Sequence, residues 1–161
     1  MDLSAYFAGF VDGEGCFTVS FSPRSKLLIG WEVRPSFSVS QNADRSEVLL
    51  LMRRHFGCGS IRPDRSDKTL KYEVRRLGDL VERIIPFFEA NPLISSKQKD
   101  FERFAKVCRL VRAGAHRNTS GLREIVDLAL PMNTSGKRKF AIEAIFPSRA
   151  EVIVSAISND G

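Results

Sequence analysis

Near the N-terminus, the spacing of hydrophobic residues changes from helical to alternating. Leu3, Phe7 and Phe10 recur at helical spacing, and Val11 widens the apolar face that they form. Asp2 stands where its side chain can accept hydrogen bonds from the free N–H groups of a first helical turn. We therefore predict a helix from residue 3 to about residue 13, with these hydrophobic side chains facing the core.

From Phe17 onward, hydrophobic and polar residues alternate. Two stretches show this period of two, residues 17–24 and 31–40, and a turn-rich segment at 22–30 connects them. Such alternation predicts two half-buried antiparallel strands. Pro35 lies inside the second strand, and because it has no N–H to donate, it argues against a central position in the sheet.

A helix is predicted to follow the first two strands. The segment DRSE, residues 44–47, has the form of a capping box, with Asp44 at the cap and Glu47 three residues later. The hydrophobic residues after it have helical spacing, and Gly57 is expected to end this helix.

The rest of the chain predicts a second pair of strands and more helices. The strands are expected within residues 58–64 and 69–76; the helices over 77–89 with a kink or break at Pro86, from Ser95 or Ser96 to Arg112, and over 121–130. Strand pairs joined by helices favour an α+β fold, in which an antiparallel sheet carries helices on one face.

The other face of this sheet is predicted to be polar. A solvated sheet face explains any single residue of this kind. The set as a whole also suits the DNA major groove, where Arg reads guanine, Ser reads most bases and Glu accepts a hydrogen bond from cytosine. Its members are Ser20, Ser22, Arg24, Glu32, Arg34, Ser36, Ser38, Ser40, Arg62, Lys71, Glu73 and Arg75.

Composition narrows the class of protein. The 161 residues fit one domain, and 43% hydrophobic with 27% charged residues is a folded, soluble composition. A net charge of +6 favours nucleic acid or another polyanion, although many basic proteins bind no DNA. Three widely spaced cysteines argue against a disulfide framework and a zinc site. We find no signal peptide or membrane span, so we expect an intracellular protein without a membrane partner.

The end of the first helix carries the most unusual chemistry. In AGFVDGEG, residues 8–15, Asp12 and Glu14 alternate with glycines at the C-terminal end of an apolar helix, where the helix dipole disfavours negative charge. The longer string FAGFVDGEG, residues 7–15, resembles the signature of the LAGLIDADG homing endonucleases, with Phe7 in place of Leu and Glu14 as the final acid.

Later segments look like further landmarks of the same family, in the same order. The resemblance covers roughly residues 3–139. The segments are FSVSQNADRSEVL (37–49), GCGSIRPD (57–64), IIPFFEANPLISSKQKDFERF (84–104) and GLREIVDLALPMN (121–133). The resemblance implies an αββαββα fold with a saddle-shaped antiparallel sheet, as one domain over residues 1–140. Residues 141–161 form a C-terminal tail without an assigned role.

The resemblance also implies a homodimer, because the signature occurs once in this sequence. Small residues on the first helix would let two such helices approach closely; close packing against the chain's own sheet is the alternative explanation for them. The interface residues would be Ala5, Ala8, Gly9, Asp12 and Gly13. Two copies of Glu14 would then meet at the base of the interface.

A metal-dependent active site is implied for this position. Glu14 would be the main metal ligand and the Gly13 carbonyl the second, holding two or three Mg²⁺ ions per dimer, with Mn²⁺ as a substitute. Gln41 would orient the water, Lys97 would face the scissile phosphate, and Arg45 would join the solvent network. A strand end and a solvated helix start are the alternatives for Gln41 and Lys97. Asp12 is expected to accept hydrogen bonds from backbone N–H groups near the helix end.

The implied substrate is double-stranded DNA with a long, partly palindromic target. Residues 24–28, including Lys26, would reach its outer bases. Phosphate contacts are expected from Lys99, Arg103, Arg117, Lys137, Arg138 and Lys139. Family enzymes cut both strands and leave short 3′ overhangs.

Two other classes of function remain compatible with the sequence. The first is a binding protein on the same fold, either an intron RNA maturase or a DNA-binding regulator that has lost cleavage. The second is a basic interaction module, whose binding would be weak, independent of sequence and strongly weakened by salt. The protein would be cytoplasmic in a bacterium, or organellar if an organelle intron encodes it.

Overall fold

The first helix leads directly into the sheet. The computed structural model describes residues 1–64, 68–134 and 142–146. Helix α1 spans Leu3–Glu14, and the Asp2 carboxylate accepts hydrogen bonds from the backbone N–H groups of Ser4 and Ala5 at 2.9 and 3.3 Å. The predicted cap is therefore confirmed. The helix runs one residue further than expected, so that Glu14 closes it and Gly15 begins the first strand.

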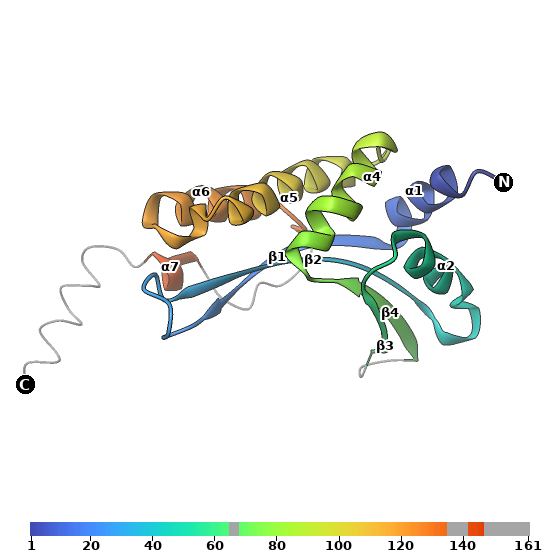
Figure 1. The fold of residues 1–161 in the computed structure, drawn as a ribbon, viewed down its shortest axis with the longest axis horizontal. Helices are drawn as coiled ribbons and strands as arrows, with labels where there is room; N and C mark the ends of the chain where they lie inside the picture. Colours follow the sequence, from blue (N-terminus) through green and yellow to red (C-terminus); the bar gives the residue numbers. More distant parts are fainter. Residues whose placement is uncertain (65–67, 135–141, 147–161) are drawn as a thin grey trace, which may run out of the picture.

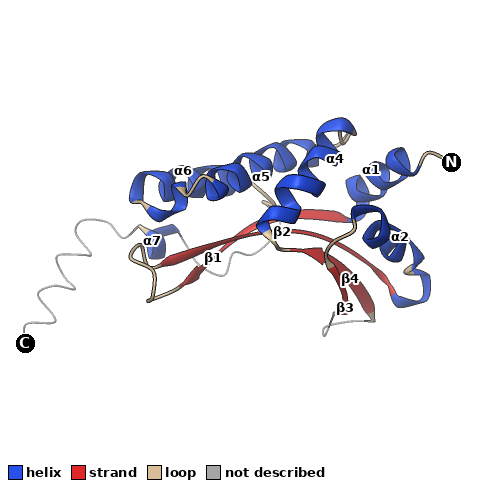
Figure 2. Ribbon diagram, viewed as in Figure 1, coloured by secondary structure: helices blue, strands red, loops and turns tan. Residues whose placement is uncertain are grey.

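Four antiparallel strands form one sheet. They are β1 (Gly15–Pro23), β2 (Trp31–Asn42), β3 (Ser60–Pro63) and β4 (Thr69–Val74), in the spatial order β1-β2-β4-β3. With the helices between the strand pairs, this is the predicted αββαββα order. Figure 2 shows the helices on one side of the curved sheet, and no helix of residues 1–64, 68–134 and 142–146 lies on the opposite side. The α+β prediction is confirmed.

Pro35 lies in a central strand, contrary to the expectation from its missing N–H. It pairs with Val19 of β1, but β4 begins to pair with β2 only at Phe37. At Pro35, β2 therefore has a strand on one side only. A proline is tolerated there because no second ladder needs its N–H.

The predicted capping box at residues 44–47 is wrong. Asp44 belongs to a short 3₁₀ turn, η1 (Ala43–Arg45), and helix α2 (Glu47–Phe56) starts after Ser46. The Ser46 hydroxyl donates to the Ala43 carbonyl at 3.2 Å and does not cap the helix. The expected end of α2 is confirmed, since Gly57 has φ +63°, the left-handed conformation that glycine adopts without strain.

The helical segment around Pro86 is continuous. It comprises α3 (Leu77–Asp79), the π-helical turn η2 (Leu80–Ile84) and α4 (Ile85–Ala90). The predicted break at Pro86 is replaced by this π-helical turn just before the proline. A π turn shifts the hydrogen-bond register, which is one way a helix accommodates the N–H that proline lacks.

The remaining helices are α5 (Lys97–Arg112), the short 3₁₀ turn η3 (Ala115–Arg117), α6 (Thr119–Ala129) and α7 (Ile142–Ile145). Of these, α5 and α6 are close to their predicted ranges, whereas η3 and α7 were not predicted. In Figure 1, α5 and α6 lie along one half of the sheet, and α1 and α2 lie at the other end. None of the helices described is long and apolar enough to cross a membrane.

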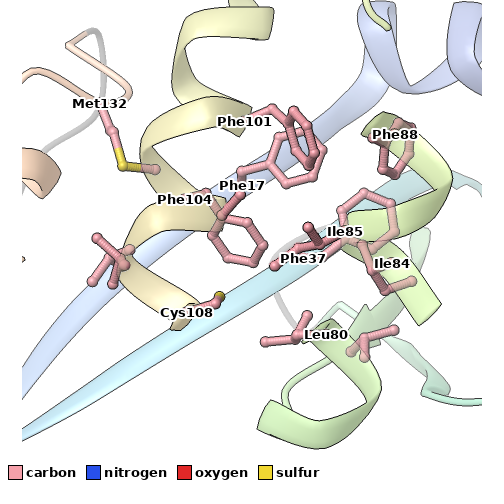
Figure 3. Packing of buried hydrophobic residues seen from close by; sticks show 14 of the residues in the cluster. Phe17, Phe37, Leu80, Ile84, Ile85, Phe88, Phe101, Phe104, Cys108 and Met132 are labelled. Atoms are coloured by element: carbon pink, nitrogen blue, oxygen red, sulfur yellow. The ribbon is translucent and has the colours of Figure 1, made fainter. Parts of the chain in front are cut away.

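Aromatic side chains join the sheet to the helices. Phe17 of β1 stacks on Phe37 of β2 at 5.2 Å between ring centroids, and both are fully buried. Phe88, Phe101 and Phe104 pack on Phe17 at 5.3–5.4 Å (Figure 3). Burying such large side chains is the main source of stability for a fold of this size.

The inward face of α1 differs slightly from the predicted one. Phe7 and Val11 are fully buried as expected, but Leu3 is 41% exposed. Ala8 joins the buried side, at 8% exposure. Leu3 lies in the first helical turn, beyond the part of α1 that packs on the sheet.

Candidate functional site

Glu14 ends α1 with its carboxylate at the polar side of the sheet. The side chain is exposed and lines the same hollow as Cys16, Ser38 and Ser40. Within the described part of the chain, no side chain or N–H group donates a hydrogen bond to it. The local sequence explains this position: Gly15 turns at once into β1, so the last helical side chain is left at the edge of the sheet.

Asp12 connects the end of α1 to the start of α5. Its carboxylate accepts hydrogen bonds from the backbone N–H groups of Ile94 and Ser95 at 3.1 and 3.0 Å, and from the Ser95 hydroxyl. The Ser95 hydroxyl bond, followed by the backbone bonds, lowers the pKa of Asp12 below its ordinary value. Asp12 therefore accepts backbone hydrogen bonds as expected, but the donors belong to the loop before α5.

Lys97 reaches back to the same helix end. Its Nζ donates to the Val11 carbonyl at 2.9 Å and to the Gly13 carbonyl at 3.4 Å, and its backbone N–H donates to Ser95 Oγ at 3.2 Å. A positive charge at the C-terminal end of a helix is favourable, since free carbonyls gather there. Asp12 of α1 thus binds the loop before α5, and Lys97 of α5 binds the end of α1.

The outer face of α1 carries a stripe of small residues. Ala5, Gly9 and Gly13 are exposed and recur every fourth residue. A Cβ atom placed on Gly9 or Gly13 would meet nothing within 4 Å, so the chain's own fold does not require glycine at either position. Ala8, which we expected on this stripe, is buried against the core instead, because it lies on the other side of the helix.

The polar face of the sheet forms a shallow hollow. It contains most of the predicted residues of the polar face, which β1, β2 and β4 place side by side (Figure 1). Residues from the predicted set that line it are Ser20, Glu32, Arg34, Ser36, Ser38, Ser40, Lys71, Glu73 and Arg75. Arg62 and Lys71 line a neighbouring hollow, and Arg24, Lys26 and Glu32 line another at the hairpin between β1 and β2.

Two carboxylates organise the arginines of this face. Glu32 forms ion pairs with Arg24 at 2.8 Å and with Arg34 at 3.3 Å. Arg34 also donates to the hydroxyl of Ser22 at 3.5 Å. The second carboxylate, Glu73, binds two more arginines and is considerably less exposed than Glu32, at 8% against 29%.

Two residues that line the hollow, Cys16 and Thr18, were not predicted from the sequence. Thr18 of β1 donates its hydroxyl to the Ser36 carbonyl at 3.4 Å, and Cys16 lies between Glu14 and Thr18 on the same face. The alternation that selected Ser20 and Ser22 extends back to both residues and could have found them. Burial raises the pKa of the Cys16 thiol, so it stays protonated near neutral pH.

Two other predicted residues, Gln41 and Arg45, form no hydrogen bond with Glu14 among the described residues. Gln41, near the end of β2, accepts a hydrogen bond from the Asn42 N–H at 2.8 Å. The Arg45 side chain is 66% exposed and lies 3.6 Å from Asp44. In the described residues, neither forms a hydrogen bond or ion pair with Lys97.

The expected phosphate-binding residues are spread over several elements. Lys99 and Arg117 are exposed, and Arg103 lies 3.7 Å from Asp100. Lys137, Arg138 and Lys139 lie outside the described residues.

Comparisons with known proteins agree with this geometry. The sequence profile described as LAGLIDADG endonuclease matches residues 7–108. The chain is 32% identical to the homing endonuclease I-ApeII of Aeropyrum pernix, over 89% of this chain and 87% of that protein. It is 29% identical to a probable intron-encoded endonuclease of Neurospora crassa over 96% of its own length, but spans only 35% of that protein.

Solved structures give the same result. The crystal structure of the homing endonuclease I-TnaI superposes with a TM-score of 0.78 at 34% identity, covering 83% of this chain and 89% of the other. The structure of I-LtrWI bound to target DNA superposes with a TM-score of 0.84 at 33% identity, covering 91% of this chain and 49% of that one.

Proposed function

Because the chain belongs to the LAGLIDADG endonuclease family, we propose that it is a homodimeric, metal-dependent endonuclease that cuts both strands of a long, partly palindromic DNA target. The chain spans only 35% of the Neurospora crassa relative, whose name describes the whole protein. I-ApeII and I-TnaI, by contrast, match this chain over nearly their full lengths. They are the better guide to its function.

The end of α1 is the observation that supports this proposal most strongly. An exposed carboxylate closes a helix whose outer face carries a stripe of small residues, and the chain's own fold does not require glycine at two of them, Gly9 and Gly13. Two such helices packed along Ala5, Gly9 and Gly13 would bring two Glu14 side chains together. A two-fold arrangement of this kind also places two polar sheet faces on the halves of a palindromic site.

The oxygen donors at this position fit a hard divalent cation. Glu14 offers a carboxylate and Gly13 a backbone carbonyl, which are the ligand types that Mg²⁺ prefers. In the described ranges, no three His, Cys, Asp or Glu side chains come together to form a metal site within one chain. A second chain would add its own Glu14, which is why the proposed site needs the dimer. When bound, such ions would supply an activated water and a counter-charge for the phosphate.

The chain's own residues would position the phosphate and the water. Lys97, held at the Val11 and Gly13 carbonyls, would place its ammonium group beside the scissile phosphate and offset its negative charge. Gln41 would orient the attacking water, and Arg45 would join the solvent network. These last two roles rest on the family resemblance alone.

The experiment is a comparison of the protein with its Glu14→Gln variant on duplexes selected from a randomised library. Glutamine keeps the shape but removes the charge, so we expect cleavage to fall by about 10³-fold, as for the loss of a group that stabilises the transition state. Binding measured in EDTA should change by less than about threefold, since Glu14 is not a phosphate-binding cation.

Two outcomes would contradict the proposal. The first is undiminished cleavage by Glu14→Gln. The second is specific binding without cleavage by the parent protein in Mg²⁺ or Mn²⁺, which would favour the maturase or regulator. Binding that is independent of sequence would favour the basic interaction module.

A further inference from the structure

Glu73 is the one buried charged residue among the described residues of the polar sheet face. It lies on β4, two residues from Lys71 and two from Arg75, and all three line the same hollow. Lys71 is half-buried and Arg75 is exposed, but only 8% of Glu73 is exposed. A carboxylate this buried must be paired, because an unpaired buried charge is strongly unfavourable.

Three side chains from three parts of the sheet share the Glu73 carboxylate. Arg62 of β3 donates from Nη2 to Oε2 at 2.7 Å, and the Nε of Arg75, just after β4, forms an ion pair with the same oxygen at 3.1 Å. Ser36 of β2 donates its hydroxyl to Oε1 at 3.3 Å. Both oxygens are therefore occupied, and the carboxylate is covered by the groups that it binds.

The two arginines remain accessible where Glu73 is not. The Arg62 side chain is 51% exposed and the Arg75 side chain 65%. A guanidinium group has five N–H donors, and each of these arginines uses one nitrogen for Glu73. In the part of the chain that the structure describes, their other nitrogens form no further hydrogen bond or ion pair, so these donors could bind guanine or phosphate in a groove lying on the sheet.

We propose that Glu73 is a positioning residue that fixes Arg62 and Arg75 for DNA recognition and does not itself contact a base. This proposal rests on the proposed function, because it concerns how the endonuclease reads its target. Binding to one shared carboxylate restricts the rotamers of two long side chains before DNA arrives, which lowers the entropy that they would otherwise lose on binding. The two arginines would then read adjacent positions as a unit.

The expected effect of removing the charge differs from that of losing a base contact. In Glu73→Gln, both arginines lose their anionic partner and the face becomes more positive by one charge. Binding to random duplex should therefore stay constant or become tighter, since it depends on phosphate neutralisation. Discrimination should fall by about tenfold at the guanines that Arg62 and Arg75 read.

We would test this loss of discrimination by measuring binding in EDTA to a panel of duplexes. The panel contains every single base substitution in the selected target. Glu32→Gln is the matched control: it removes the same charge from the other carboxylate, which pairs with Arg24 and Arg34. It should weaken discrimination at a different set of positions. In the double variant Glu73→Gln/Arg62→Ala, the loss of discrimination should be smaller than the sum of the single losses, because Glu73 acts through Arg62.

A measurement on the protein without DNA distinguishes a positioning role of Glu73 from a role in folding stability. Nitrogen-15 NMR signals of the Nε–H groups should shift for Arg62 and Arg75 in Glu73→Gln and stay in place for Arg24 and Arg34, while the melting temperature changes little. Global unfolding of the variant would mean that Glu73 has a purely structural role and would overturn the proposal.

The remaining outcomes distinguish the two proposals. If the parent protein binds every duplex equally, the proposed function fails and the positioning role with it. If the parent discriminates and Glu73→Gln discriminates equally well, only the positioning role fails. Loss of preference at a single cytosine would show that Glu73 contacts a base directly, and would also overturn it.

Discussion

The end of α1 and the polar face of the sheet hold their functional side chains in different ways. At the end of α1, Asp12 and Lys97 bind mainly backbone groups, the N–H groups of residues 94 and 95 and the carbonyls of residues 11 and 13. On the sheet face, Glu32 and Glu73 bind the side chains of arginines that are half exposed or more. The functional side chains at the end of α1 are therefore held by the main chain, and those on the sheet face are held by ion pairs with other side chains.

This difference suggests a division of labour. A backbone group cannot leave without moving a helix, so the geometry at Glu14 should be the same whatever DNA is bound. The arginines of the sheet face are exposed, and an ion pair with an exposed partner contributes little to stability, so replacing one of these arginines should cost little folding free energy. Variants at the end of α1 should therefore change the rate of cleavage, and variants on the sheet face should change sequence preference.

After Glu14→Gln, the largest loss of cleavage is expected from a variant that prevents two chains from pairing along α1 and so removes the proposed second Glu14 from the site. Gly9→Leu places a large side chain on the outer face of α1, where a Cβ atom has open space within the monomer. The monomer should keep its stability or gain some, because leucine is a better helix former than glycine. Two helices could no longer approach closely, and cleavage should fall by at least about 10²-fold.

Sedimentation in solution and on the duplex, with thermal unfolding, measures both parts of this prediction. The matched control is Gly78→Leu, another helical glycine whose added Cβ would meet nothing within 4 Å. It should leave assembly and cleavage unchanged. A Gly9→Leu variant that still dimerises and cuts would show that the stripe of small residues is not the interface.

A smaller effect is expected from Asp12→Asn. The amide accepts hydrogen bonds more weakly than the carboxylate, so the loop at residues 94–95 and Lys97 behind it become less well fixed. Cleavage should slow by about tenfold in kcat, with KM and sequence preference nearly unchanged. The control is Asp2→Asn, which makes the same charge change at the opposite end of α1. It should lower the stability of the protein somewhat and leave kcat unchanged.

The pH dependence of stability gives Asp12 a second signature. The Ser95 hydroxyl and the backbone N–H groups lower the pKa of Asp12 below 3.8 in the folded protein, so its contribution to stability is fully present above that pH and is lost as the pH falls through the folded pKa. The difference in urea midpoint between the parent and Asp12→Asn should be constant from about pH 8 to pH 5 and shrink below about pH 4. A constant difference down to pH 3 would contradict this assignment.

The two regions also differ in how much of them the sequence could predict. Alternation placed Ser36, Arg62 and Glu73 on one face, because the side-chain period of a strand is fixed by its geometry. It could not predict that Glu73 is buried, because two of the three groups that bind it, Arg62 and Ser36, come from other strands. That depends on the strand order, which alternation does not determine.

At α1, the hydrophobic periodicity predicted the helix, but it did not predict which of the small residues on the helix would face the core. Ala5 and Ala8 both have small side chains, yet one is exposed and the other buried, since the packing of Phe7 and Val11 sets the rotation of the helix. The capping box failed for a similar reason. Asp44 and Glu47 have the right spacing, but the chain leaving β2 first makes a 3₁₀ turn, so the helix starts later.

The smallest effect is expected at a phosphate contact, which belongs to neither region. Lys99 is exposed in the first turn of α5, two residues after Lys97. Lys99→Gln should weaken binding by about two- to fivefold for every duplex alike and reduce the slope of log K against log salt by about one. The kcat and the sequence preference should not change, which distinguishes Lys99 from both Asp12 and Glu73.

Lys106→Gln is the matched control for Lys99, because Lys106 is exposed on the same helix but lies 3.6 Å from Glu124. Its charge is partly balanced already, so its replacement should leave the salt slope unchanged. If Lys99→Gln instead weakened binding to some sequences and not others, Lys99 would be reading bases. Recognition would then extend beyond the sheet face, and the separation between positioning by phosphate contacts and reading by the sheet would no longer hold.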